Sequence, residues 1–240
     1  MTRLLALETA TPASSVALGE GPDLVASSIR VDARGHEAFL ISAVDFCFDQ
    51  SGWQPSELDA VIVDIGPGLY TGIRVGLATA QGLAAALGVP IITVSSLDAI
   101  ALRAATRRRD IWAIVDVRRG ELAAAEYRPL PGGVVREGSP ELTNPDALRG
   151  VLESAPEEIL LVGDTEALPD GFTSGLHRVK TGRPRYPTPD ALLELGAGKL
   201  ERGEELSPSE VRPFYLREPD VTINWQLLRE EGPWQGWESP

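Results

Sequence analysis

The sequence predicts an α/β protein in which short strands and helices alternate around a mixed sheet. Residues 58–65 (LDAVIVDI) form an almost continuous β-branched run, which is typical of a strand buried on both faces. A segment with helical spacing of apolar residues follows at 71–87, and Gly88 and Pro90 are suited to end it. A second apolar run at 91–94 continues the alternation.

The beginning of the chain is expected to form three strands and a helix. Short apolar runs at 4–7 and 15–18 flank a Thr-Pro-Ala-Ser turn, which is typical of a β-hairpin, and residues 24–31 are predicted as a third strand. Residues 36–50 (HEAFLISAVDFCFDQ) carry apolar side chains at helical spacing. The following Ser51-Gly52 is expected to end that helix.

A charged break divides the chain near its middle. Residues 97–106 (LDAIALRAAT) predict a helix that either Ser95 or Ser96 can cap. The sequence RRRD follows at 107–110. We interpret it as a solvated turn between two lobes rather than as a basic patch.

The second half repeats the α/β pattern at smaller scale. Strands are predicted at 111–117 and 121–127, joined at Arg118-Arg119-Gly120. Residues 129–145 are rich in proline and glycine, so we expect loops there, or loops with a short strand at Val134-Val135. A short helix is then expected at 146–153, and a strand at 159–162.

One more clear helix begins at Thr188-Pro189-Asp190, where threonine can cap and proline suits the first turn. We expect an N-terminal lobe at 1–106 and a C-terminal lobe at 107–221, whose last helix and tail can pack back on the first lobe. Residues 222–240, with three of the five tryptophans, are expected to be irregular.

Composition excludes several classes of protein. The formal net charge is -13, which argues against unaided binding of nucleic acid because phosphates require a basic face. No apolar run approaches the roughly 20 residues that span a bilayer, and the start of the chain does not resemble a signal peptide. A single cysteine excludes an internal disulfide framework and favours a cytoplasmic location.

The stretch DIGPGLYTGIRVG at 64–76 permits two interpretations. Gly66 and Gly68 allow positive φ and close backbone approach, and the amides of 69–72 would point outward from a helix N-terminus, which favours an anion. The stretch matches neither a P-loop nor a dinucleotide fingerprint. A tight strand-to-helix turn uses the same glycines, so both interpretations remain open.

The helix after this loop carries a stripe of small side chains. The stripe is formed by Gly72, Gly76, Ala80 and Ala84, four positions apart, and small residues in register let another element approach closely. The stripe can pack against the protein's own sheet. The remaining face is also largely apolar, however, and such a helix is usually buried on two sides. The second side is therefore a candidate partner surface.

Few residues suggest catalysis. His36 and His177 have no second metal ligand at helical spacing that points the same way, and Cys47 is expected in the core. Three carboxylates near strand ends could hold a metal-bound nucleotide or serve structure alone: Glu8, Asp64 and Asp116. A basic cluster is either a solvated loop or a docking patch for phosphate or RNA, and comprises Arg178, Lys180, Arg183 and Arg185.

Taken in order, several motifs resemble a known family. They are ETATPASSVALGE, HEAFL, GPGLYTGIRVG, GLAAALGVPIITVSSLDAIA, DVRRGE and VRPFYLREPDV. Together they resemble the TsaB (YeaZ) family of bacterial tRNA threonylcarbamoyladenosine biosynthesis proteins, from the first strand to about Val221. The resemblance implies a two-lobe fold of the actin, Hsp70 and sugar-kinase type with ribonuclease-H-like cores.

The resemblance also implies a role and partners. Members of the family are not the catalyst. They pair with a homologous subunit, TsaD, which transfers a threonylcarbamoyl group to the adenosine beside the anticodon (adenosine 37) in tRNAs that read codons beginning with A. A small ATPase, TsaE, joins them. The resemblance therefore implies no intrinsic cofactor here, with ATP and metal in the TsaD and TsaE partners.

This sequence departs from the catalytic relative in ways that fit a non-catalytic subunit. Two histidines four apart bind metal in that relative, whereas His36 and Leu40 stand here. The phosphate hairpin commonly reads Asp-Thr-Ser and the later loop Ser-Phe, where this chain has Glu-Thr-Ala and Leu-Tyr. The degenerate phosphate loop is expected to comprise Glu8, Thr9, Ala10, Gly66, Gly68, Thr71 and Gly72.

By resemblance, the partner surface is built from helices 36–50 and 71–87, and it is used by TsaD in the cell and by a second copy of the chain alone. The expected interface residues are His36, Phe39, Leu40, Ala43, Val44, Cys47, Gly72, Ile73, Gly76, Ala80, Leu83 and Ala84. The alternative is an active ATP-dependent kinase or hydrolase of the same fold. A protease ranks last, because no nucleophile and base are paired.

Overall fold

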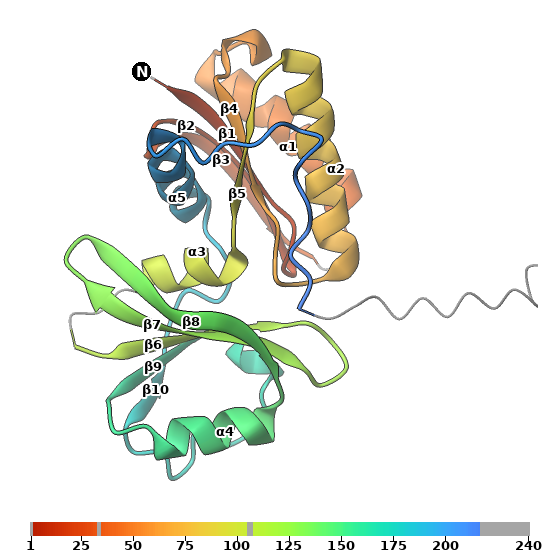
Figure 1. Ribbon diagram of the computed structural model, residues 1–240. Coiled ribbons are helices and arrows are strands. Elements are labelled where there is room, and N and C mark those ends of the chain that lie inside the picture. Colours follow the sequence, from red (N-terminus) through yellow and green to blue (C-terminus); the bar gives the residue numbers. More distant parts are fainter. Residues whose placement is uncertain (1, 33–34, 105–107, 217–240) are drawn as a thin grey trace, which may run out of the picture.

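The protein is built from two lobes, each with its own five-stranded sheet (Figure 1). The computed structural model describes residues 2–32, 35–104 and 108–216. The strand orders are β3-β2-β1-β4-β5 and β8-β7-β6-β9-β10. In each sheet the first three strands in chain order are antiparallel and the next two add in parallel. The repeated order and direction confirm the predicted two-lobe fold of the actin and sugar-kinase type.

The first sheet follows the sequence pattern closely. Every residue of β4 is buried, as expected for a β-branched strand with a layer on each side. β4 begins later than the predicted residue 58, since Leu58 caps a short 3-10 helix, Pro55–Glu57. The strands are β1 (Arg3–Glu8), β2 (Ala13–Glu20), β3 (Asp23–Val31), β4 (Ala60–Asp64) and β5 (Ile91–Val94).

Helices cover both faces of this sheet. α1 (His36–Ser51) and α2 (Tyr70–Leu87) bury their inner sides in one hydrophobic cluster on the first face. α5 (Pro189–Glu201) lies on the opposite face, where Leu192 and Leu193 are fully buried. The chain thus returns from the second lobe to complete the core of the first.

α3 (Ser96–Arg103) joins the lobes. Its apolar side packs on β6 (Asp110–Asp116) and β7 (Leu122–Leu130) in the cluster that holds Tyr127. α4 (Pro145–Ser154) covers the other face of the second sheet. The resulting layers run from α1 and α2 through the first sheet, α5 and α3, and the second sheet to α4 (Figure 1).

The second sheet contains the main departures from prediction. The expectation of loops throughout 129–145 is wrong, because β8 (Gly133–Thr143) pairs with β7 over most of its length. The alternative with a strand at Val134-Val135 is confirmed, but that strand is much longer than predicted. β8 is mostly exposed and contains Gly138 and Pro140, so hydrogen bonds rather than burial hold it, and it lacks the usual strand pattern. β10 (Val179–Thr181) was not predicted, and β9 is Ile159–Gly163.

Glycines end the helices as expected, but the predicted N-caps do not bond. Gly52 and Gly88 adopt the left-handed conformation after α1 and α2. Ser95 and Thr188 occupy the N-cap positions of α3 and α5, yet neither side chain accepts a capping hydrogen bond. Both hydroxyl groups are buried without a partner.

A C-terminal strap, residues 206–216, runs back along α2 (Figure 1). Leu206 forms a bridge with Ile91, Gln81 donates a hydrogen bond from Nε2 to the carbonyl oxygen of Pro208 at 2.7 Å, and Val211 is buried in the α1–α2 cluster. The predicted irregular tail at 222–240 lies outside the described residues. Within the described part of the chain, no helix combines the length and apolarity needed to cross a bilayer.

Candidate functional site

The candidate site lies where β1 and β4 end, at the edge of the first sheet that faces the second lobe. Because these neighbouring strands are parallel, their terminal acids Glu8 and Asp64 come close enough to interact electrostatically. Both side chains are fully buried. The site therefore begins with two carboxylates removed from water.

The chain itself occupies most of the acceptor capacity of these acids. Glu8 Oε1 accepts hydrogen bonds from the amide and hydroxyl of Thr11 at 2.9 and 3.0 Å, while Glu8 Oε2 is buried without a partner. Asp64 accepts from the Gly66 amide and from the Ser96 hydroxyl, each at 2.8 Å.

Burial makes both acids hard to ionise. Desolvation, followed by the charge of Asp64, raises the pKa of Glu8 well above its ordinary value. Desolvation also raises the pKa of Asp64, to about 7, against the opposing hydrogen bonds from Gly66 and Ser96. At neutral pH both carboxyl groups therefore retain a proton more readily than exposed acids do.

The glycine-rich loop packs directly on the β1–β2 turn. The amide of Leu69 donates to the carbonyl oxygen of Ala10 at 2.6 Å. A Cβ at Gly68 would collide with that same oxygen, and Gly66 adopts a φ of 101°. Close packing thus explains the glycine at 68, and backbone conformation explains the one at 66, as the tight-turn interpretation expects. Anion binding by this loop stays a prediction.

His36 lies beside this turn at the start of α1. Its Nδ1 is 2.5 Å from the Ser14 hydroxyl, and its Nε2 is buried without a partner. Burial lowers the pKa of His36, and the charge of Asp32 partly offsets this. Among the residues that the structure describes, no three His, Cys, Asp or Glu side chains gather as metal ligands. Asp116 therefore does not complete a metal site with Glu8 and Asp64.

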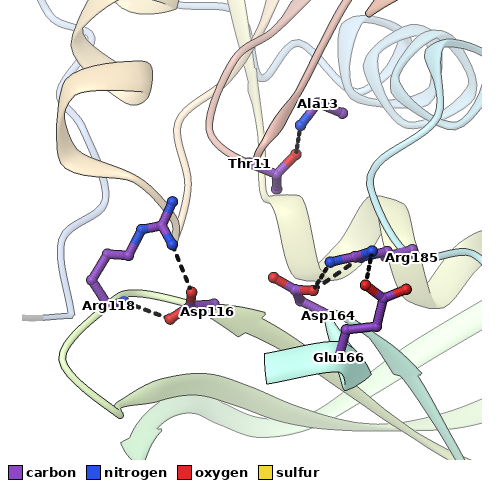
Figure 2. A network of polar contacts seen from close by, with 7 residues as sticks. All are labelled: Thr11, Ala13, Asp116, Arg118, Asp164, Glu166 and Arg185. Carbon is purple, nitrogen blue, oxygen red and sulfur yellow. Dashed lines mark hydrogen bonds and ion pairs between the residues drawn. The ribbon is translucent and has the colours of Figure 1, made fainter. Parts of the chain in front are cut away.

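Two groups of ion pairs, around Asp116 and around Arg185, lie on the second lobe near the β1–β2 turn (Figure 2). The Asp116 carboxylate accepts from the Arg118 amide at 2.7 Å and pairs with the Arg118 guanidinium at 3.3 Å. Arg185 donates through Nε and Nη2 to Asp164 at 3.0 and 2.8 Å and also pairs with Glu166. Thr11 of the β1–β2 turn points toward the Asp164–Arg185 pair (Figure 2).

The Asp164–Arg185 pair divides the predicted basic cluster. Arg178 donates to the carbonyl oxygen of Pro156 at 2.8 Å and closes a turn near α4. Arg185 is neutralised by Asp164, while Lys180 and Arg183 are exposed. The spacing of the four basic residues in the sequence could not show that Asp164 would fold against Arg185.

Comparison with known proteins places the chain in a family. The sequence profile described as "TsaD: tRNA N6-adenosine threonylcarbamoyltransferase" matches residues 26–152. The chain is 30% identical to the tRNA threonylcarbamoyladenosine biosynthesis protein TsaB of Escherichia coli, over 94% of this chain and 98% of that protein. The chain belongs to the TsaB (YeaZ) family.

Other relatives agree with membership of the TsaB family. The Bacillus subtilis TsaB is 27% identical over 92% of this chain and 97% of its own length. A Mycobacterium leprae protein of uncharacterised function is 35% identical, but the chain spans only 56% of its length. The structure of YeaZ from Pseudomonas aeruginosa superposes with a TM-score of 0.75 at 30% identity, covering 90% of this chain and 100% of that one.

In this TsaB-family chain, the predicted interface side chains mostly face inward. The expectation that they form exposed surface is wrong, because the chain's own sheet and the β1–β2 turn cover them: a Cβ at Gly76, for example, would collide with the Thr9 hydroxyl. Phe39 and Leu83 are half-buried. The buried members are His36, Leu40, Ala43, Val44, Cys47, Gly72, Ile73, Gly76, Ala80 and Ala84.

Cys47 is part of this core. It is fully buried, and desolvation raises the pKa of its thiol to about 11. A thiol of such high pKa is a poor nucleophile at neutral pH. The interpretation of Cys47 as a core residue is confirmed.

The outer face of the same two helices is exposed and contains small or apolar side chains. On α2, Ala78, Gly82 and Ala85 point to solvent, and nothing lies within 4 Å of a Cβ built at Gly82. On α1, Ile41 and Phe46 are 53% and 48% exposed. We call these five residues the outer face. Sequence periodicity did not identify the outer face because small residues of α2 form two sets, one buried and one exposed.

Proposed function

We propose that this chain acts in the formation of threonylcarbamoyladenosine on tRNA as a non-catalytic subunit, pairing with a TsaD-like subunit through the outer face. Membership of the TsaB family supports the role in tRNA modification, and the E. coli and B. subtilis relatives carry that role in their names. The match of residues 26–152 to the TsaD profile supports a homologous partner.

The burial and hydrogen bonding of Glu8 and Asp64 are the observation that supports a non-catalytic role for this chain. An ATP-dependent kinase or hydrolase of this fold would need carboxylates that reach a metal-bound nucleotide. Here both are fully buried and bonded to the chain itself. The residues present do not fit a metal-bound nucleotide at this position.

The outer face supports pairing. Ile41 and Phe46 are large apolar side chains that cost free energy when left in water, and Gly82 gives a partner helix room to approach α2 closely. We propose that a TsaD-like subunit covers this face in the cell and that a second copy of the chain covers it when the protein is alone. A TsaE-like ATPase and tRNA are proposed to join through the complex.

Reconstitution tests the proposal. The chain, a TsaD-like and a TsaE-like subunit from the same source, tRNA, ATP and a threonylcarbamoyl donor are combined, and modified adenosine is measured by mass spectrometry. We expect modification only when the chain is present, and loss of modification with Gly82→Arg. Modification at full rate without the chain would refute the role.

Calorimetry distinguishes the non-catalytic role from the alternative, an ATP-dependent kinase or hydrolase. We expect no measurable heat when ATP and magnesium are titrated into the chain alone. Saturable binding together with ATP turnover by the chain alone would favour the kinase or hydrolase instead.

A further inference from the structure

Arg74 is an exposed arginine whose side chain is fixed by two tyrosines. Its guanidinium carbon lies 3.8 Å from the centre of the Tyr70 ring, and Nε donates to the Tyr215 hydroxyl at 3.1 Å. The two rings stack with their centres 4.9 Å apart. Tyr70 begins α2 and Tyr215 belongs to the strap, so two distant segments hold the cation in place.

This arginine has no acidic partner in the described part of the chain, although acids outnumber bases by 35 to 22. Most other arginines there pair with carboxylates: Arg103 contacts Asp190 and Glu194, for instance. A guanidinium has five N–H donors, and among residues 2–32, 35–104 and 108–216 the hydrogen bond of Arg74 is made through Nε alone. The two terminal nitrogens are therefore oriented but available.

Arg74 stands at one end of the outer face. Four of the exposed residues of α2 are Arg74, Ala78, Gly82 and Ala85, at the three- and four-residue spacing that places side chains on one side of a helix. A helix laid over the small residues would pass the terminal nitrogens of Arg74. The strap, through Tyr215, borders the face at this end.

We propose that Arg74 is a specificity-determining residue of the outer face, which receives a carboxylate from the partner subunit's helix packed along Ala78, Gly82 and Ala85. This inference rests on the proposed pairing function. A planar guanidinium binds a carboxylate through two parallel hydrogen bonds, which fixes both position and orientation. Because Tyr70 and Tyr215 already hold the side chain, little rotamer freedom is lost on binding. The pair thus selects one register of the partner helix.

The test measures affinity for the partner subunit from the same source by biolayer interferometry. We expect Arg74→Glu to weaken binding about 10- to 100-fold and Arg74→Lys to weaken it less, because lysine keeps the charge but loses the planar fork. Binding by the wild type should weaken as NaCl rises from about 50 to 300 mM, and this salt dependence should shrink in Arg74→Gln.

Arg202→Glu provides the matched control, since it makes the same change of charge at an exposed arginine after α5. We expect its affinity to stay within about twofold of the wild type, because charges so far from the outer face are screened. Changing single Asp or Glu residues of the partner's helix to Lys should identify one change that restores binding of Arg74→Glu. A loss that no such change restores would overturn the ion pair.

The outcomes distinguish this inference from the pairing proposal. If Arg74→Glu binds like the wild type while Gly82→Arg does not bind, the inference fails and the pairing proposal stands. If neither variant changes the affinity, the outer face is not the interface and both fail. If Arg74→Glu keeps the partner but loses tRNA from the complex, the cation serves RNA phosphate and the carboxylate proposal is overturned.

Discussion

The Thr9 hydroxyl donates a hydrogen bond of 2.7 Å to the carbonyl oxygen of Gly72, although the residues are 63 positions apart. A Cβ at Gly72 would in turn collide with the carbonyl oxygen of Thr9. The β1–β2 turn and the start of α2 are therefore packed backbone to backbone. The β1–β2 turn and the glycine-rich loop thus fill each other's space.

Gly72→Ala and Gly76→Ala should each destabilise the protein. The added methyl group meets the Thr9 carbonyl oxygen in one case and the Thr9 hydroxyl in the other, and neither can move without breaking the contact between turn and helix. We expect a loss of about 2 to 4 kcal/mol in the free energy of unfolding, measured by urea denaturation.

Gly82→Ala is the matched control for these variants, because nothing lies within 4 Å of its Cβ. Alanine is favoured over glycine inside a helix, so this change should stabilise by up to about 1 kcal/mol. Equal effects at Gly72 and Gly82 would contradict the packing described here.

Glu8→Gln should stabilise the protein more at high pH than at low pH. The pKa of Glu8 is raised in the folded state, so between its unfolded and folded values the folded state binds more protons, and stability falls as pH rises through that interval. The amide cannot ionise, and its oxygen can still accept from Thr11. Thermal unfolding from about pH 5 to pH 9 should show a gap between variant and wild type that widens with pH.

Glu57→Gln controls for a general effect of removing an acid, because Glu57 is exposed and its pKa is lowered by hydrogen bonds from Gln54 and Arg3. This variant should not gain stability at high pH. A constant difference between Glu8→Gln and wild type across the range would show that Glu8 ionises normally in the fold.

His36 should give the opposite pH dependence. Burial lowers its pKa in the folded state, so the unfolded state binds more protons as pH falls through the ordinary range near 6.5, and the wild type loses stability on the acid side. His36→Asn removes this titration. The free energy of unfolding of the wild type should therefore fall relative to that of the variant below about pH 6.5, and urea denaturation at several pH values measures this difference. A difference that does not change with pH would contradict a lowered pKa of His36.

Tyr127→Phe should loosen the contact between α3 and the second sheet. The buried Tyr127 hydroxyl donates to Asp98 at 2.8 Å, and Arg136 reaches the same carboxylate oxygen at 2.9 Å. Loss of the hydroxyl should cost about 1 to 2 kcal/mol in the free energy of unfolding. Tyr186→Phe, at a half-buried tyrosine, is the control; an equal loss there would argue against a specific role for Asp98.

The sequence predicted the buried strands well and the exposed ones poorly. β4 and β5 are continuous apolar runs because layers cover both of their faces. β8 is polar and contains Gly138 and Pro140, so its pairing with β7 depends on hydrogen bonds that leave no hydrophobic pattern. Its existence could not be predicted from periodicity.

The candidate site could be predicted only in part. The loop glycines and Glu8 were recognisable as sequence motifs, whereas the contact of Glu8 with Asp64 requires the order of the strands. The predicted interface residues of α1 and α2 lie mostly in the core, whereas the exposed small and apolar residues of the same helices occupy another register. Gly76 and Gly82 are both small residues of α2, and only the fold shows that Thr9 covers the first and nothing covers the second.

The most direct test of the central claim compares Gly82→Arg with Gly150→Arg. Both replace an exposed glycine inside a helix with open space around it, Gly82 on α2 and Gly150 on α4. The mass of each variant with the TsaD-like subunit is measured by size-exclusion chromatography with light scattering. We predict that Gly150→Arg forms the complex and that Gly82→Arg elutes as a folded, separate chain; a complex of unchanged mass with Gly82→Arg would contradict the account.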